Sequence, residues 1–177
     1  MTDRSRCRSD AGFTLIEILV TLVIGSILMA ISVWGMHSYL VASRESGTAS
    51  DIRSALRSAG EHALSEGRTY CVYFTSSQWT VYKASCTTAT PANKVVGPLK
   101  VQDRSLTLTG VSFAAPATPV PNQTTSCPST GKCAYFYPRG TSLTGSLVVS
   151  RPSGKTYRIC VQGLTARVWI ASGSTCG

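Results

Sequence analysis

The stretch "GFTLIEILV", residues Gly12–Val20, places a glutamate, Glu17, inside the most apolar segment of the chain. A carboxylate in a membrane helix costs about 2.5–3.5 kcal/mol on insertion scales. Residues 18–43 carry no formally charged side chain, and roughly 20 such residues are enough to cross a bilayer. We therefore expect a membrane-spanning helix in which Glu17 has a specific role that offsets its cost.

The residues on either side of this stretch distinguish an anchor from a secretory signal. Residues 1–12, "MTDRSRCRSDAG", are polar and indicate a cytoplasmic leader. A secretory signal has a shorter apolar core that ends at a small-residue cleavage site, and neither feature occurs here. The apolar segment, residues 13–40, is therefore expected to stay in the protein.

The helical pattern continues beyond the apolar run as an amphipathic segment, residues 41–67. Apolar residues recur at helical spacing from Ile52 to Ala63, and Gly67 is a stop signal. The sequence therefore predicts one helix from Phe13 to about Glu66, about 80 Å long at 1.5 Å per residue. Its first half would lie in lipid or in a helical bundle, and its second would pack on a soluble domain.

Residues 68–177 change to short β-branched and aromatic runs separated by Ser, Thr, Gly and Pro. We predict an α+β protein in which the long N-terminal helix packs on a C-terminal antiparallel β-rich domain. The expected strands are Thr69–Thr75, Trp79–Lys83, Ser105–Phe113, Ala134–Tyr137, Gly145–Ser150, Thr156–Gln162 and Ala166–Ala171.

The last two predicted strands allow a test of register. With Gly163 and Leu164 as a two-residue turn, Val161 faces Ala166, and Arg158 faces Trp169. Apolar residues then meet apolar residues on one side of the hairpin and polar residues meet on the other, as sheet pleating requires. The outward face is expected to carry Arg158, Arg167 and Trp169 together.

The positive charge of the protein is concentrated in the same half of the chain. From Arg68 onward there are eleven Lys and Arg residues against a single acid, Asp103. Such a field attracts polyanions such as nucleic acid, anionic lipid or acidic glycans. The alternative is a solvated basic surface that only keeps the domain soluble.

Seven cysteines indicate disulfides and a compartment outside the cytoplasm. Six of them follow Gly67, which allows fifteen pairings. We expect the three sequence-local pairs, Cys71–Cys86, Cys127–Cys133 and Cys160–Cys176. Zinc is not expected because no CxxC occurs and the compartment is oxidising, and calcium is not expected because Asp103 is the one carboxylate after Gly67.

Catalysis has little support in the sequence. The two histidines, His37 and His62, both lie on the predicted helix, where a structural role is the simpler interpretation. No Ser/His/Asp set or suitably spaced pair of carboxylates occurs in the β-rich half. We therefore expect a protein that is not an enzyme and that has no cofactor or metal.

The stretch "GFTLIEILVTLVIGSIL" resembles the N-terminus of type IV pilins and type II secretion pseudopilins. The resemblance implies that a prepilin peptidase cuts after Gly12 and methylates the new N-terminus, Phe13. It also implies that Glu17 pairs with the N-terminal amine of a neighbouring subunit during assembly, an ion pair that offsets the cost of both charges. The implied partners are other minor and major pilins and an inner-membrane assembly platform.

The C-terminal stretch "FYPRGTSLTGSLVVSRPSGKTYRICVQGLTARVWIASGSTC" resembles the end of the GspH/FimT family of minor pilins, which includes FimT and FimU. That family has a Gly-Arg-x-Arg segment on its last hairpin. Here Arg167 matches the first arginine, Ala166 replaces the glycine, and Trp169 replaces the second arginine. The middle of the chain, residues 69–133, carries no motif that we can assign to the family.

Members of this family are implicated in capturing DNA for natural transformation, so the resemblance implies sequence-independent, salt-sensitive binding to phosphates. Trp169 could stack on a base, or Arg158 could simply lie over Trp169 as a cation–π pair. The expected contacts are Arg139, Arg151, Lys155, Arg158, Arg167 and Trp169.

Two further roles remain open from the sequence. One is a structural minor pilin that primes assembly and sits at the filament tip, and the other is the pseudopilin H of a type II secretion system. If the protein is a pilin, it is first a single-pass inner-membrane protein with a periplasmic domain and then part of an extracellular pilus.

Overall fold

The fold is described from a computed structural model, for residues 13–87, 90–101, 105–114, 126–152, 155–171 and 175–176. The leader, including Gly12 at the expected cleavage site, lies outside these residues. The chain divides into two compact units, one up to Leu40 and one from Val41 onward. We describe each unit by itself.

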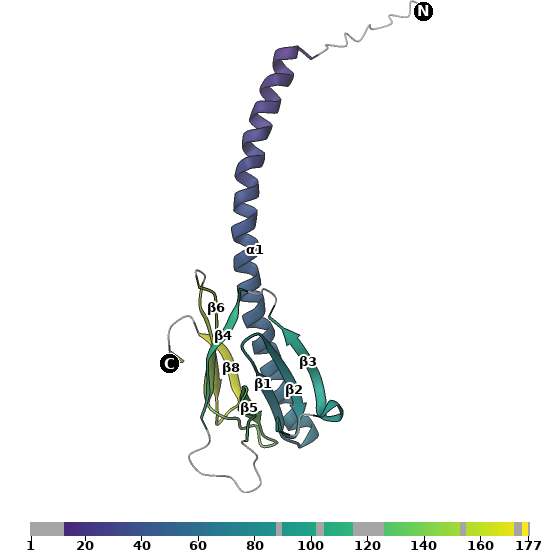
Figure 1. Ribbon diagram of the computed structural model, residues 1–177, viewed down its shortest axis with the longest axis vertical. Coiled ribbons are helices and arrows are strands. Elements are labelled where there is room, and N and C mark those ends of the chain that lie inside the picture. Colours follow the sequence, from purple (N-terminus) through teal and green to yellow (C-terminus); the bar gives the residue numbers. More distant parts are fainter. Residues whose placement is uncertain are drawn as a thin grey trace, which may run out of the picture. The chain divides into compact units, whose positions relative to one another are not determined.

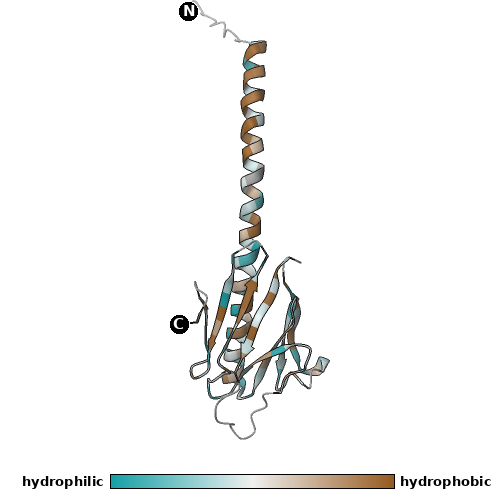
Figure 2. Ribbon diagram, turned by 60° about the vertical axis from the view of Figure 1, so that its left-hand side comes forward, coloured by the Kyte–Doolittle hydropathy of each residue, from teal (hydrophilic) through white to brown (hydrophobic). Residues whose placement is uncertain are grey.

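The predicted long helix is present as α1, Leu15–Glu66. Up to Leu40 its described large apolar side chains are exposed, among them Leu15 and Ile24, and this part of α1 is mostly brown in Figure 2. By length and composition the helix can cross a membrane. Its first turn is capped by Thr14, whose Oγ1 accepts a hydrogen bond from the Glu17 amide at 3.3 Å.

The second unit contains two four-stranded antiparallel sheets around the C-terminal part of α1 (Figure 1). The first sheet has the order β3-β2-β1-β5 and the second the order β4-β6-β7-β8. The strands are β1 (Tyr70–Phe74), β2 (Gln78–Lys83), β3 (Lys94–Lys100), β4 (Thr107–Phe113), β5 (Lys132–Phe136), β6 (Gly145–Ser150), β7 (Tyr157–Gln162) and β8 (Arg167–Ala171).

Seven of these strands correspond to the predicted ones, with ends that differ by at most two residues. The sequence analysis missed β3, because Gly97 and Pro98 interrupt its pattern. Proline lacks the N–H that a central strand needs, but an edge strand tolerates it. Since β3 is the edge of the first sheet, a proline there is compatible with the strand.

The main core lies between α1 and the two sheets. The helix contributes a stripe that includes Ile52 and Leu56, both fully buried, as the helical periodicity predicted. The first sheet adds residues such as Trp79, and the second adds residues such as Leu147 and Ile159. This shared core is what holds the second sheet, and therefore the terminal hairpin, against the helix.

A smaller core covers the first sheet on the side away from the main core, and disulfides hold it together. The structure has the three disulfides expected from the sequence, Cys71–Cys86, Cys127–Cys133 and Cys160–Cys176. The first two belong to this smaller core. The Tyr135 hydroxyl accepts a hydrogen bond from the Cys86 amide at 3.3 Å and donates one to the Ser126 carbonyl, so it joins the two loops over the sheet.

Candidate functional site: a basic groove on the terminal hairpin

The hairpin of β7 and β8 forms, but its predicted register is wrong by two residues. Val161 pairs with Val168, and Cys160 pairs with Trp169. The turn uses four residues, Gly163–Ala166, instead of two, and Ala166 ends it in the left-handed region with a φ of 50°. Because a slip of two residues keeps every side chain on its own face, the predicted outward face is preserved.

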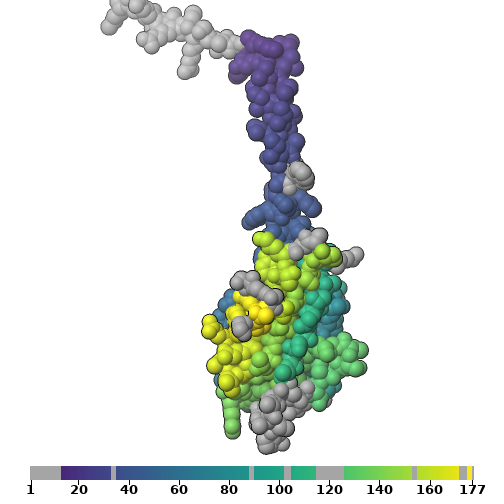
Figure 3. All heavy atoms as spheres, turned by 90° about the vertical axis from the view of Figure 1, so that its left-hand side faces the viewer, coloured from purple at the N-terminus to yellow at the C-terminus, as the bar shows by residue number. Residues whose placement is uncertain are grey.

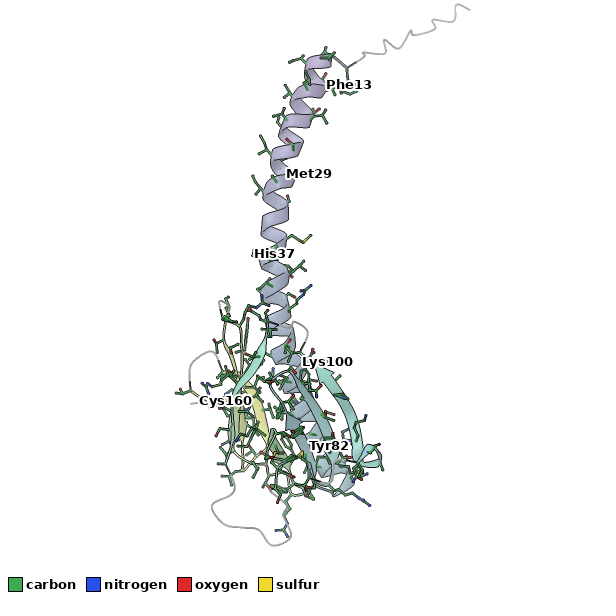
Figure 4. All side chains as sticks on the ribbon, viewed as in Figure 1. Phe13, Met29, His37, Tyr82, Lys100 and Cys160 are labelled. Carbon is green, nitrogen blue, oxygen red and sulfur yellow. A yellow bond between two sulfur atoms is a disulfide. The ribbon has the colours of Figure 1, made fainter. Side chains whose placement is uncertain are left out.

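That outward face forms one wall of a groove of about 850 Å³. Its lining includes Ser112, Ser146, Arg158, Arg167, Trp169 and Thr175, and the described lining contains no carboxylate. The Cys160–Cys176 disulfide holds Cys176 against the hairpin, and Thr175 and Cys176 also line the groove. Figure 3 shows the yellow C-terminal strands at this surface, and Figure 4 labels Cys160 on the second sheet.

The two arginines of the groove have different surroundings. Arg158 is half-buried, and its Nη1 donates a hydrogen bond to Ser146 Oγ at 3.1 Å. Its Nε is buried and has no hydrogen-bond partner in the described part of the chain. Arg167 is exposed, with its guanidinium carbon 5.9 Å from the centroid of the Trp169 ring. The alternative of a cation–π pair between Arg158 and Trp169 is therefore wrong, because Arg167 is the arginine that lies over the ring.

The remaining basic residues expected at the site lie elsewhere. Arg151 is mostly buried and forms an ion pair with Glu45 of α1. The backbone amide of Lys155 donates to the same carboxylate at 3.3 Å. Arg139 is exposed in the turn after β5. Of the six expected contacts, the structure therefore brings three together in the groove: Arg158, Arg167 and Trp169.

The sequence analysis missed Ser146 and the tail as parts of the groove. Ser146 pairs with Cys160 across β6 and β7, and this register places its hydroxyl within reach of Arg158. A single serine in a strand gives no signal of such a role. The predicted Cys160–Cys176 disulfide was the feature of the sequence that could have placed the tail beside the hairpin.

The N-terminal residues singled out by the sequence are exposed in the structure. Phe13 and Glu17 are both exposed. Glu17 also occupies the third helical position after Thr14, which is the arrangement of a capping box, and an acid there favours the positive end of the helix. Glu17 therefore has a local role in starting α1 besides any role in assembly.

The marked pKa shifts in the described residues lie away from the groove. Hydrogen bonds from Lys83 and from the Tyr70 hydroxyl lower the pKa of Glu66 to about 2. Burial, together with the hydrogen bond to Glu66, raises the pKa of Tyr70 to about 12. Burial also raises the pKa of Tyr137 to about 12.

The cysteines of the smaller core come close enough to suggest a metal site. The sulfur atoms of Cys71, Cys86 and Cys133 lie within 4.8 Å of one another. All three belong to disulfides. Because a metal is bound by thiolates, these sulfurs are not available as ligands in the oxidised protein.

Two family models match the chain. The model described as prokaryotic N-terminal methylation motif matches residues 7–33, and the model described as type II transport protein GspH matches residues 48–165. The second match covers more than half of the chain. A search of curated proteins finds no significant match.

Two solved structures are similar to this chain. The minor pseudopilin EpsH from the type II secretion system of Vibrio cholerae is 11% identical with a TM-score of 0.55, over 77% of this chain and 99% of that one. The type IV minor pilin FimU of Pseudomonas aeruginosa strain PAO1 is 12% identical with a TM-score of 0.44, over 71% of this chain and 87% of that one. The similarity to EpsH indicates a common fold.

Proposed function

The chain belongs to the family of type II transport protein GspH, a family of minor pilins and pseudopilins, and from this premise we propose that it is a minor type IV pilin that binds DNA through its terminal hairpin. The observation that carries the DNA-binding part is the groove that holds Arg158, Arg167 and Trp169 together with no carboxylate in its described lining.

The N-terminal segment supports the pilin part of the proposal. The methylation motif covers Gly12, Phe13 and Glu17, so the prepilin peptidase is the proposed partner that cuts after Gly12 and methylates Phe13. Before cleavage, α1 anchors the subunit in the inner membrane, with the β-rich unit on the periplasmic side. After cleavage, Glu17 pairs with the amine of another pilin, and the subunit enters the extracellular pilus, where we place it near the tip.

The chemistry of the groove suits an extended polyanion. Guanidinium groups bind phosphates with two directed hydrogen bonds, and neutralising phosphates makes the affinity independent of sequence and dependent on salt. Ser146 holds Arg158 in place, which reduces the entropy lost on binding. The ring of the half-buried Trp169 can stack on an unpaired base.

Binding should be measured with the full chain in a nonionic detergent and fluorescent single- and double-stranded oligonucleotides. We expect Arg158→Ala with Arg167→Ala to weaken binding more than about tenfold at low salt. Lys94→Ala with Lys100→Ala is the matched control, because it removes the same charge at the ends of β3 in the other sheet (Figure 4 labels Lys100).

Two results would contradict the DNA-binding proposal. One is that the unmodified chain shows no salt-sensitive binding. The other is that the groove variant and the β3 control lose affinity equally, since only the net charge would then matter. Trp169→Ala adds a further readout, because loss of base stacking should weaken single-stranded binding more than double-stranded binding.

The matching family description, type II transport protein, favours a second candidate function. In that case the chain is a pseudopilin of a type II secretion system, and the basic groove is a solvated surface. A deletion strain separates the possibilities. Loss of DNA uptake with piliation intact supports the DNA-binding pilin, loss of both supports a priming role in assembly, and loss of protein secretion alone supports the pseudopilin.

A further inference from the structure

A second groove, of about 420 Å³, lies between α1 and the start of β8. One face of the helix supplies Arg53, Arg57, Gly60, Glu61 and Leu64, and the end of the hairpin turn supplies Thr165, Ala166, Arg167 and Val168. Arg167 lines this groove and also the first one. Because β8 is the edge of its sheet, no further strand of the described chain separates the two grooves.

The second groove is also basic. Among the described residues, its lining contains three guanidinium groups and one carboxylate, Glu61. Arg57 Nη2 lies 3.7 Å from Glu61 Oε1, and both side chains are largely exposed. An exposed pair of this kind contributes little to stability, so Arg57 can exchange Glu61 for a phosphate at little cost. Arg53 is half-buried, and its Nε is buried with no hydrogen-bond partner in the described chain.

The spacing of the two helix arginines suits consecutive phosphates. Arg53 and Arg57 are four residues apart in α1, which puts their Cβ atoms about 5–6 Å from each other on one face. Phosphates on one strand of DNA follow each other every 3.4 Å or so along the axis. The two flexible side chains can therefore reach separate phosphates of the same strand.

We propose that the DNA-binding surface crosses the edge of β8 and continues onto α1, with Arg53 and Arg57 as further phosphate contacts. This inference rests on the proposed function, because it extends the same site. Arg167 is the shared residue, contacting the strand where it passes from the first groove to the second.

The position of Arg139 agrees with such a path. Its turn ends at Gly140, where an added Cβ would lie 3.3 Å from Leu64 Cδ2, and Leu64 lines the second groove. Arg139 itself lines neither groove, but its turn lies beside a side chain that lines the second.

The test is the salt dependence of binding by the full chain in nonionic detergent. Each phosphate contact contributes about 0.7 (single-stranded) to 0.9 (double-stranded) to the slope of log K against log salt. We expect Arg53→Ala with Arg57→Ala to lower that slope by about 1.4–1.8. Arg53→Lys with Arg57→Lys keeps both charges and should keep the slope.

The double variant Lys94→Ala with Lys100→Ala again removes an equal charge and should leave the slope nearly unchanged. If the helix variant behaves like this control while Arg158→Ala with Arg167→Ala abolishes binding, the extension onto α1 is wrong and the hairpin site stands. If the unmodified chain does not bind DNA, both proposals fail. Thermal unfolding of each variant checks that the domain is intact.

Discussion

Arg151 Nε lies 3.3 Å from Glu45 Oε1, close enough for an ion pair although the two atoms are not aligned as a hydrogen bond. The pair joins the residue after β6 to α1, and both side chains are largely buried, with 14% and 3% exposed. Lys155 completes it by donating its backbone amide to the other oxygen of Glu45. The pair therefore fastens the β6–β7 connection to the helix.

Replacing Arg151 with methionine should destabilise the domain strongly. The change leaves the Glu45 carboxylate buried without its cation, which costs about 3 kcal/mol. Unfolding in urea measures the loss. Glu45→Gln combined with Arg151→Met should recover much of it, and a double variant no more stable than Arg151→Met alone would contradict the pairing.

Replacing Ala166 with glycine should stabilise the domain. Ala166 has a φ of 50°, where an L-residue with a Cβ is disfavoured by about 1–2 kcal/mol and glycine is not. After the larger backbone entropy of glycine in the unfolded chain is subtracted, a gain of about 0.5–1 kcal/mol remains. The matched control is Ala171→Gly in β8, an extended position where glycine should destabilise.

The ion-pair cluster at the end of α1 predicts a loss of stability in acid. The folded protein lowers the pKa of Glu66 from 4.5 to about 2, so its contribution is complete above pH 4.5 and is lost as the pH falls toward 2. The stability difference between the wild type and Glu66→Gln should therefore shrink over that range. A difference independent of pH would contradict the assignment.

Removing the last disulfide should affect both stability and the groove. Cys160→Ser with Cys176→Ser opens a loop with a sequence separation of 16, which corresponds to about 3 kcal/mol in the chain-entropy account. The tail should also leave the groove wall, which Thr175 and Cys176 help to form. Urea unfolding measures the first effect, and proteolysis of the C-terminal tail measures the second.

The two roles of Glu17 can be separated by two substitutions. Glutamine at the third helical position retains hydrogen-bonding capacity for the cap but carries no charge, whereas alanine has neither. If an ion pair with another subunit drives assembly, both Glu17→Gln and Glu17→Ala should be processed at the leader but poorly incorporated into pili. Normal incorporation of Glu17→Gln would show that the charge is not needed.

Local sequence patterns determined most of the elements. The apolar run and the helical period predicted α1, and the β-branched runs predicted seven strands. The short separations of the cysteines led to the disulfide pairs found. The alternation along the last two strands put Arg158, Arg167 and Trp169 on one face. These features depend on backbone hydrogen bonding and side-chain period within a few residues, so a single segment contains the information.

Only the tertiary structure decided the hairpin register, the edge strand β3, the burial of Arg151 and the approach of Arg53 and Arg57 to Arg167. The register depended on the positive φ of Ala166, a conformation that an alanine in the sequence does not predict. The two contacts with α1 join segments about 100 residues apart, because the packing of α1 against both sheets sets which side chains meet. Strand β3 pairs with the nearby β2, and its place at the edge of the sheet is what makes its proline compatible with a strand. The sequence by itself therefore located the basic hairpin, while packing decided which of its arginines are free to bind and which helix residues lie beside them.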